Sequence, residues 1–217
     1  MNKKTSAQTI LKEHSAFEKI KTYVYYAKIP KKYTFEKVYP LSRQKEIDSA
    51  TNIKVKEQKY FVWKLLSVSL NHLFGLDIKQ FNMRKKPSGK WVSKDIYFSL
   101  SHSKNVVAVA ISCEPVGVDL QAIVDLRGKI ENKTLTKKEK QEFNLLQEEQ
   151  KQEYLITKWA QKESVFKMKN KLVFKPSKIQ TSSYSLLNYT FTVGDQNFVL
   201  CTSGKNLSGA RICEKQI

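Results

Sequence analysis

The segment Lys158-Trp159-Ala160-Gln161-Lys162-Glu163-Ser164-Val165-Phe166-Lys167 lies in a run, Glu148 to Lys169, that contains no glycine or proline. Most residues of this run favour helix, so the run predicts a long helix. In a helix, Trp159, Glu163 and Lys167 share one face, because they are four residues apart. Phe166 flanks the same face. A carboxylate between two aromatic rings on a partly buried face implies a charged partner or a metal ion.

The composition bounds the fold and the partners of the chain. Its 217 residues are 41% hydrophobic and 11% aromatic, which is enough for a packed core and excludes global disorder. The net charge of +19 predicts an acidic or phosphorylated partner. Most of the basic residues are lysine, whereas nucleic-acid readers favour arginine for bidentate contacts. The charge is therefore weak evidence for DNA or RNA binding.

Cysteine usage and hydropathy indicate a cytoplasmic protein. The three cysteines, Cys113, Cys201 and Cys213, form neither a CxxC pair nor a metal-ligand spacing. The basic N-terminal residues lack the apolar segment of a signal peptide. No stretch approaches the roughly 20 apolar residues that a membrane span needs.

Periodicity and turn residues predict an order of helices and strands along the chain. Residues 1–20 remain undecided between a short helix and an extension. Helices are expected at 41–49, 54–73, 136–146 and 148–169, with Gly75 ending the second and a capping box of Thr136 and Glu139 starting the third. Strands are expected at 21–29, 77–83, 96–100, 106–112, 116–121, 189–193, 198–202 and 210–213. Residues 101–105 are expected to form a polar turn, and the three strands around it one antiparallel sheet.

This order predicts an α+β fold made of two similar α/β subdomains in a pseudo-twofold arrangement. Each subdomain would pack one long helix on an antiparallel sheet. We place the N-terminal subdomain at residues 1–115 and the C-terminal subdomain at 116–217, within one continuous monomer. A functional site between the halves would then combine the middle of the chain with the helix at 148–169.

A second acidic residue lies in the predicted strand Gly117-Val118-Asp119-Leu120-Gln121. Strand alternation directs Asp119 and Gln121 to one face. Aspartate is disfavoured inside strands, so Asp119 is either a surface residue or a functional one, with about equal weight. Paired with Glu163, it would suit a hard cation such as Mg²⁺, and Gln121 would offer a neutral oxygen.

Three segments in order resemble one enzyme family. They are Phe98-Ser99-Leu100-Ser101-His102-Ser103, Gly117 to Gln121, and Trp159 to Lys167. They resemble the Ser-His-Ser, Gly-Val-Asp and Trp-x-x-Lys-Glu motifs of the 4′-phosphopantetheinyl transferases of the surfactin-synthetase-activating (Sfp) type. The resemblance is clear from Gly89 to Lys169. It implies transfer of phosphopantetheine from coenzyme A to a serine of an apo acyl or peptidyl carrier protein, with release of 3′,5′-ADP.

The resemblance also implies roles for individual residues. Asp119 and Glu163, with Gln121, would hold Mg²⁺ against the coenzyme A pyrophosphate. Asp119, Glu163 and Lys167 would form the catalytic set, with Glu163 or a water beside it as base and Glu139 as a second candidate. Phosphate contacts would come from five residues: Lys90, Ser101, His102, Lys162 and Lys167. The many lysines would attract an acidic carrier protein.

Two departures from the family pattern leave alternatives open. Gln121 stands where many members have a third carboxylate, and Trp91 follows Gly89-Lys90 where proline is frequent. One alternative is therefore a member that binds coenzyme A and a carrier with weak or no turnover. Another is a basic nucleic-acid-binding protein, although no nucleic-acid motif is present. The sequence does not distinguish fatty-acid, polyketide and peptide carriers.

Overall fold

The computed structural model describes residues 22–124 and 130–217, so the undecided residues 1–20 lie outside it. The helices are α2 (Leu41–Asp48), α3 (Ile53–Phe74), α4 (Glu131–Thr134), α5 (Lys137–Asn144) and α6 (Glu148–Lys169). The strands are β1 (Thr22–Lys28), β2 (Met83–Lys85), β3 (Trp91–Ser93), β4 (Tyr97–Ser103), β5 (Val106–Ser112), β6 (Val116–Ala122), β7 (Ser185–Val193), β8 (Gln196–Gly204) and β9 (Arg211–Glu214). Three short 3₁₀ helices are η1 (Ile78–Gln80), η2 (Pro176–Lys178) and η3 (Thr181–Ser183).

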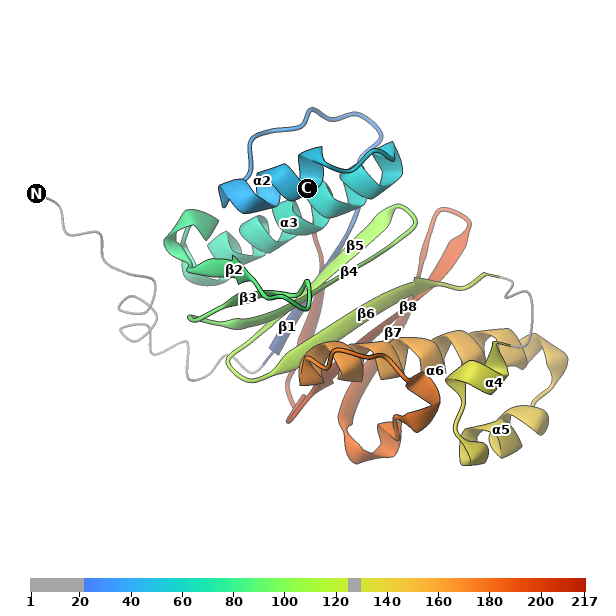
Figure 1. Ribbon diagram of the computed structural model, residues 1–217. Coiled ribbons are helices and arrows are strands. Elements are labelled where there is room, and N and C mark those ends of the chain that lie inside the picture. Colours follow the sequence, from blue (N-terminus) through green and yellow to red (C-terminus); the bar gives the residue numbers. More distant parts are fainter. Residues whose placement is uncertain (1–21, 125–129) are drawn as a thin grey trace, which may run out of the picture.

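Two sheets lie face to face between the two long helices (Figure 1). The first sheet has the strand order β4-β5-β1-β9, and α3 packs on its outer face through residues such as Phe61, Leu65 and Leu66. The second has the order β6-β8-β7, and α6 covers it on the opposite side of the molecule. The core between the sheets combines small and branched side chains, such as Ala108, Ala110 and Leu120, with the aromatic rings of Tyr26 and Phe198.

Both halves repeat one plan, β1-α3-β4-β5 and β6-α6-β7-β8. In each, the first strand pairs antiparallel with the second strand of the hairpin. The predicted α+β fold with one long helix per sheet is confirmed. The first sheet is not wholly antiparallel, however, because β9 adds to β1 in parallel. The division at residue 115 stays a prediction, and β9 crosses it to join the N-terminal half.

Several local predictions were wrong. The strand expected at 77–83 is replaced by η1 at Ile78–Gln80, started by a capping box of Asp77 and Gln80, and β2 begins at Met83. Ser101-His102-Ser103 belongs to β4, and the turn follows at Lys104, whose φ of 53° is left-handed. β6 does not extend the β4-β5 hairpin; it pairs with β8 in the second sheet. The helices were located more accurately: α6 has the predicted bounds, and Gly75 caps α3 in the left-handed conformation.

Serine side chains join the two sheets where β4 runs beside β6. The hydroxyl oxygens of Ser99, Ser101 and Ser103 accept hydrogen bonds from the backbone N–H groups of Val118, Leu120 and Ala122 at 3.0, 3.0 and 2.9 Å. These serines alternate along β4, so all three face β6. They satisfy N–H groups that would otherwise be buried without partners.

Gly117 permits close packing of α6 on β6. A Cβ atom at this position would lie 1.9 Å from the backbone oxygen of Ser164, a distance that real atoms do not adopt. Gly117→Ala is expected to lower the free energy of unfolding by about 1–3 kcal/mol, because one element must shift. Urea unfolding measures this. Gly204→Ala is the control, since its Cβ would meet mainly the flexible Leu207 side chain. Equal losses in the two variants would contradict the packing argument.

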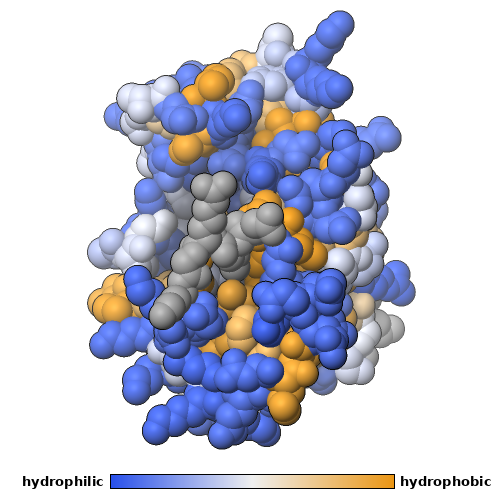
Figure 2. Space-filling model, turned by 90° about the vertical axis from the view of Figure 1, so that its right-hand side faces the viewer, coloured by the Kyte–Doolittle hydropathy of each residue, from blue (hydrophilic) through white to orange (hydrophobic). Residues whose placement is uncertain are grey.

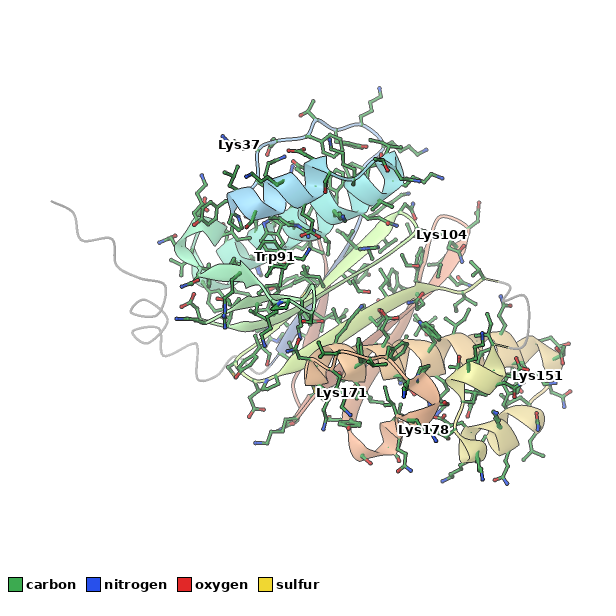
Figure 3. The ribbon with its side chains drawn as sticks, in the orientation of Figure 1. Lys37, Trp91, Lys104, Lys151, Lys171 and Lys178 are labelled. Carbon is green, nitrogen blue, oxygen red and sulfur yellow. The ribbon has the colours of Figure 1, made fainter. Side chains whose placement is uncertain are left out.

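The outer surface is mainly hydrophilic. Figure 2 shows one face on which hydrophilic residues predominate, with hydrophobic residues exposed between them. Among the lysines labelled in Figure 3, Lys37, Lys104, Lys151 and Lys178 lie toward the outside of the molecule. Lys171 lies nearer the middle, by the C-terminal end of α6, and Trp91 lies inside, beside α3. Within the described ranges, no helix combines the length and apolarity needed to cross a membrane.

Candidate functional site

Asp119 on β6 and Glu163 on α6 meet at the ammonium group of Lys167. Lys167 Nζ lies 2.6 Å from Asp119 Oδ1 and 3.4 Å from Glu163 Oε1. Asp119 is 1% exposed, whereas the side chains of Glu163 and Lys167 are 26% and 22% exposed. The fold thus brings together two carboxylates that are distant in sequence, at the edge of solvent.

Neighbouring polar groups fix both carboxylates. Ser101 donates its O–H to Asp119 Oδ1 at 2.9 Å, and the Gln121 amide donates to Asp119 Oδ2 at 2.8 Å. The Trp159 indole N–H donates to Glu163 Oε2 at 2.9 Å, one helical turn away. Gln121 lies on the same side of β6 as Asp119, as alternation predicted. In this structure it acts as a hydrogen-bond donor to Asp119.

The charges of this cluster are strongly coupled. Burial and the negative charge of Asp119 raise the pKa of Glu163, against the opposing effects of Lys167 and Trp159. Burial would lower the pKa of Lys167, but Asp119 and Glu163 outweigh it and raise that pKa. The cluster therefore needs a cation to hold two nearby negative charges.

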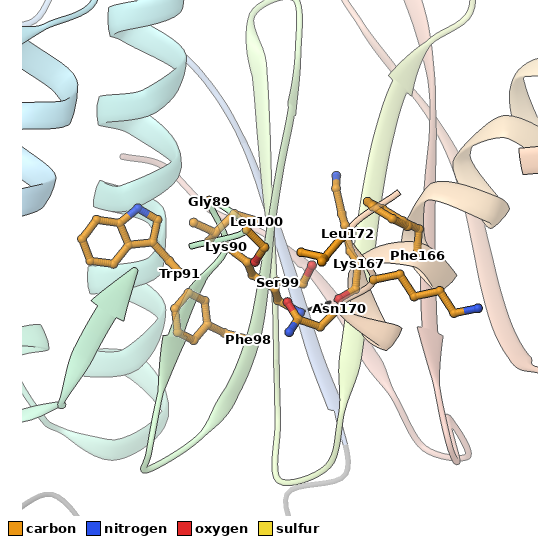
Figure 4. Close-up of a pocket in the computed structure, with 12 residues that line it drawn as sticks. Gly89, Lys90, Trp91, Phe98, Ser99, Leu100, Phe166, Lys167, Asn170 and Leu172 are labelled. Atoms are coloured by element: carbon orange, nitrogen blue, oxygen red, sulfur yellow. Dashed lines mark hydrogen bonds between the residues drawn. The ribbon is translucent and has the colours of Figure 1, made fainter. Parts of the chain in front are cut away.

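A basic and aromatic cavity of about 270 Å³ opens beside Lys167. Figure 4 shows Trp91 and Phe98 on one side of it and Phe166 and Leu172 on the other. Lys90, Lys167 and Lys171 also line it. The ammonium group of Lys90 donates a hydrogen bond to the backbone oxygen of Lys167, near the end of α6. This cavity suits a ligand that carries both phosphates and an apolar ring.

A second cavity, of about 350 Å³, lies on the other side of the carboxylate cluster. Gln121, Glu163 and Trp159 line it together with apolar residues such as Val124 and Ile156. Lys167 therefore borders the first cavity and Glu163 the second. This arrangement places the cluster between a basic space and a largely apolar one.

Lys162 and Glu139 do not belong to this cluster, which corrects two expectations. Lys162 is 0% exposed and donates to Glu139 Oε2 at 2.6 Å and to the backbone oxygens of Pro176 and Ile179 at 3.1 Å each. All three ammonium protons are thus used inside the protein. Glu139 also caps α5; burial would raise its pKa, but the bonds from Lys162 and Thr136 outweigh this effect and lower it. Lys162 therefore has no free donor for a phosphate, and Glu139 serves as an internal counter-ion.

The two remaining predicted phosphate contacts differ in position. Ser101 is 5% exposed and points toward Asp119. His102 lies on the opposite face of β4 and is exposed. Although the side chain reaches solvent, part of the imidazole is desolvated; this desolvation, then the positive charges of Lys167 and Arg43, lower the pKa of His102.

A buried arginine near the site was missed by the sequence reasoning. Arg43 is 4% exposed and lies 4.9 Å from the Trp63 ring and 5.9 Å from the Trp91 ring. Trp91 donates to Glu46, which also pairs with Arg43. Trp91, noted only as a departure from the family pattern, thus anchors one wall of the basic cavity. No motif or spacing around Arg43 in the sequence indicated that it would be buried against these rings.

The donor set fits Mg²⁺. Asp119 and Glu163 already converge on one cation, and Mg²⁺ commonly binds one or two carboxylates together with waters and phosphate oxygens. Across residues 22–124 and 130–217, no three His, Cys, Asp or Glu side chains gather as a metal-binding group. A carboxylate in place of Gln121 would supply the third acidic side chain of such a group.

Comparison with known proteins points to the same family as the motifs. Residues 115–206 match the family model of the 4′-phosphopantetheinyl transferase superfamily. This segment is less than half of the chain, and it contains Asp119, Gln121, Glu163 and Lys167. The match supports the superfamily and leaves the Sfp-type subgroup undecided. No curated protein matches the sequence.

Proposed function

We propose that this protein transfers the 4′-phosphopantetheine group of coenzyme A to a serine hydroxyl of an apo acyl or peptidyl carrier protein. The observation that carries the proposal is the meeting of Asp119 and Glu163 at Lys167, beside a cavity lined by lysines and aromatic rings. The match of residues 115–206 supports phosphopantetheine transfer as the reaction class. A monomer of Sfp type acting in the cytoplasm is the form we expect.

The two cavities suggest how the substrates would lie. Lys90, Lys167 and Lys171 would bind the phosphates of coenzyme A, and Trp91 and Phe98 would contact its ring. Asp119 and Glu163 would hold Mg²⁺, which supplies charge neutralisation at the pyrophosphate when bound. The acceptor serine would approach from the second cavity, which Glu163 borders.

The reaction balances without a further reactant. The serine oxygen forms a bond to the phosphorus that carries the pantetheine arm, and the bond from that phosphorus to 3′,5′-ADP breaks. The electron pair of the broken bond leaves with 3′,5′-ADP. The serine proton goes to Glu163 or to a water beside it. Lys167 would stabilise the negative charge that develops on the phosphoryl oxygens.

Release of 3′,5′-ADP tests this proposal. Coenzyme A, Mg²⁺ and a panel of apo carriers from fatty-acid, polyketide and peptide synthases are combined with the protein. Release that depends on one carrier supports transfer and identifies the acceptor. Binding of coenzyme A and carrier without release would favour the second candidate, a non-catalytic member, which Gln121 in place of a third acid makes reasonable. Binding to DNA or heparin at physiological salt, without release, would favour a nucleic-acid partner.

Coenzyme A affinity is expected to fall as the pH rises through about 8. Burial, then the charges of Lys86 and Lys167, lower the pKa of Lys90 to about 8. Below this pH the ammonium attracts phosphate, and above it the neutral amine does not. Bound phosphate favours the ammonium, so the midpoint moves upward in the complex. Calorimetric titration from pH 6.5 to 9.5 measures the trend, which Lys90→Gln removes and the exposed control Lys94→Gln retains. A flat profile in the unmodified protein would contradict the role of Lys90.

A further inference from the structure

We propose that Ser101 is a positioning residue that orients the Asp119 carboxylate, instead of a ligand for coenzyme A. The inference deepens the proposed function and rests on it. Ser101 donates its O–H to Asp119 Oδ1 at 2.9 Å. It accepts the Leu120 N–H at 3.0 Å and the Lys167 ammonium at 3.1 Å.

These three contacts use the whole hydrogen-bonding capacity of the hydroxyl. A serine hydroxyl has one proton to donate and two lone pairs to accept. The proton goes to Asp119, and the lone pairs go to Leu120 and Lys167. Ser101 is also 5% exposed, so a substrate phosphate reaches it only by breaking one of these bonds. The geometry therefore assigns the Ser101 hydroxyl to hydrogen bonds within the protein, instead of to a bond with the substrate.

The row of serines on β4 separates this role from a general structural one. Ser99 and Ser103 also accept one backbone N–H from β6 each. Ser101 adds to this common contact a bond to Asp119 and one from Lys167. All three serines therefore join the sheets, and the middle one also links that junction to the charged cluster. Ser103 lies two residues away on the same face and is a matched control.

Ser101 limits the rotation of the Asp119 side chain. Ser101 and Lys167 hold Oδ1, and Gln121 holds Oδ2, so both oxygens have fixed partners. Without the hydroxyl, Lys167 would be the only remaining hydrogen-bond partner of Oδ1 among these residues, and Lys167 would also have to bind the substrate phosphate. Groups that orient a metal-binding or reacting side chain typically contribute about 10- to 100-fold to affinity or activity.

Ser101→Ala and Ser103→Ala provide the first comparison. Each variant loses one bond between the sheets. Ser101→Ala also loses the contacts with Asp119 and Lys167, so its thermal midpoint should fall further than that of Ser103→Ala. Only Ser101→Ala is expected to lower kcat, by about 10- to 100-fold, with little change in the KM for the carrier. Ser101→Thr retains the hydroxyl and should recover most of kcat. If Ser101→Ala does not fold, Ser101→Cys replaces it, because a thiol is a weak donor of similar shape.

A double-mutant cycle in urea tests the same contact without substrate. The effects of Ser101→Ala and Asp119→Ala on the unfolding midpoint should be non-additive, whereas those of Ser103→Ala and Asp119→Ala should add. Equal kcat in the two serine variants, or additivity in both cycles, would overturn the proposal. Absence of transfer in the unmodified protein would count against the proposed function. The urea cycles would still decide whether Ser101 holds Asp119.

Discussion

Glu163→Gln is expected to reduce kcat for phosphopantetheine transfer by about 10²- to 10³-fold while the protein stays folded. The amide has the size of the carboxylate, and its oxygen can still accept the Trp159 indole N–H, which now lies 2.9 Å from Glu163 Oε2. The substitution therefore removes a charge and a proton acceptor with little change in packing. Lys167 would retain Asp119 as its closer partner, at 2.6 Å.

The matched control for this prediction lies on the same helix. Glu153 is exposed on α6, so Glu153→Gln removes an identical charge away from the site. It should leave kcat within about threefold of the unmodified value, since surface substitutions have small effects. Initial rates of 3′,5′-ADP release at saturating coenzyme A measure both variants. A Glu163→Gln protein with near-normal kcat would remove Glu163 from the mechanism.

Lys162→Met is expected to lower the free energy of unfolding by about 3–5 kcal/mol, the largest stability effect that we predict. Lys162 is fully buried and holds three acceptors on two other segments: Glu139 at the start of α5, and the backbone oxygens of Pro176 and Ile179. Without the ammonium, Glu139 becomes a buried carboxylate that lacks its main partner. The two backbone oxygens also lose a donor.

Two further variants separate the buried pair from helix effects. Lys151→Met removes an ammonium from the same helix, where it pairs with an exposed Glu148, and should cost less than about 1 kcal/mol. Adding Glu139→Gln to Lys162→Met removes the unpaired charge and should recover part of the lost stability. Urea unfolding gives all three values. A loss for Lys162→Met no larger than that for Lys151→Met would show that the pair is unimportant.

The sequence predicted the elements better than their partners. The run from Glu148 to Lys169 lacks helix breakers, so α6 was located to the residue. Alternation along β6 correctly placed Asp119 and Gln121 on one face. The segment Ser101-His102-Ser103 was misassigned to a turn because polar residues in a strand normally indicate exposure. Here the serines satisfy β6, a strand of another sheet, and no local pattern reveals that contact.

The two carboxylates of the site were predictable from the sequence, whereas the residues that surround and support them were less so. Asp119 and Glu163 were recognised because carboxylates within apolar elements need a reason to be there. Lys162 was misjudged because a lysine beside Glu163 in sequence points about 100° away from it on the helix, toward Glu139. Composition does not distinguish such a buried lysine from one that binds phosphate. The Arg43 contacts with Trp63 and Trp91 depend on tertiary packing alone.

The intact mass of an apo carrier protein, measured after incubation with this protein, coenzyme A and Mg²⁺, tests the central claim most directly. We predict that one carrier of the panel gains the mass of a single phosphopantetheine group. Changing the acceptor serine of that carrier to alanine should abolish the gain, and so should omitting coenzyme A. Unchanged mass in every carrier, with a folded protein that binds coenzyme A, would contradict the claim that Asp119, Glu163 and Lys167 form a transferase site.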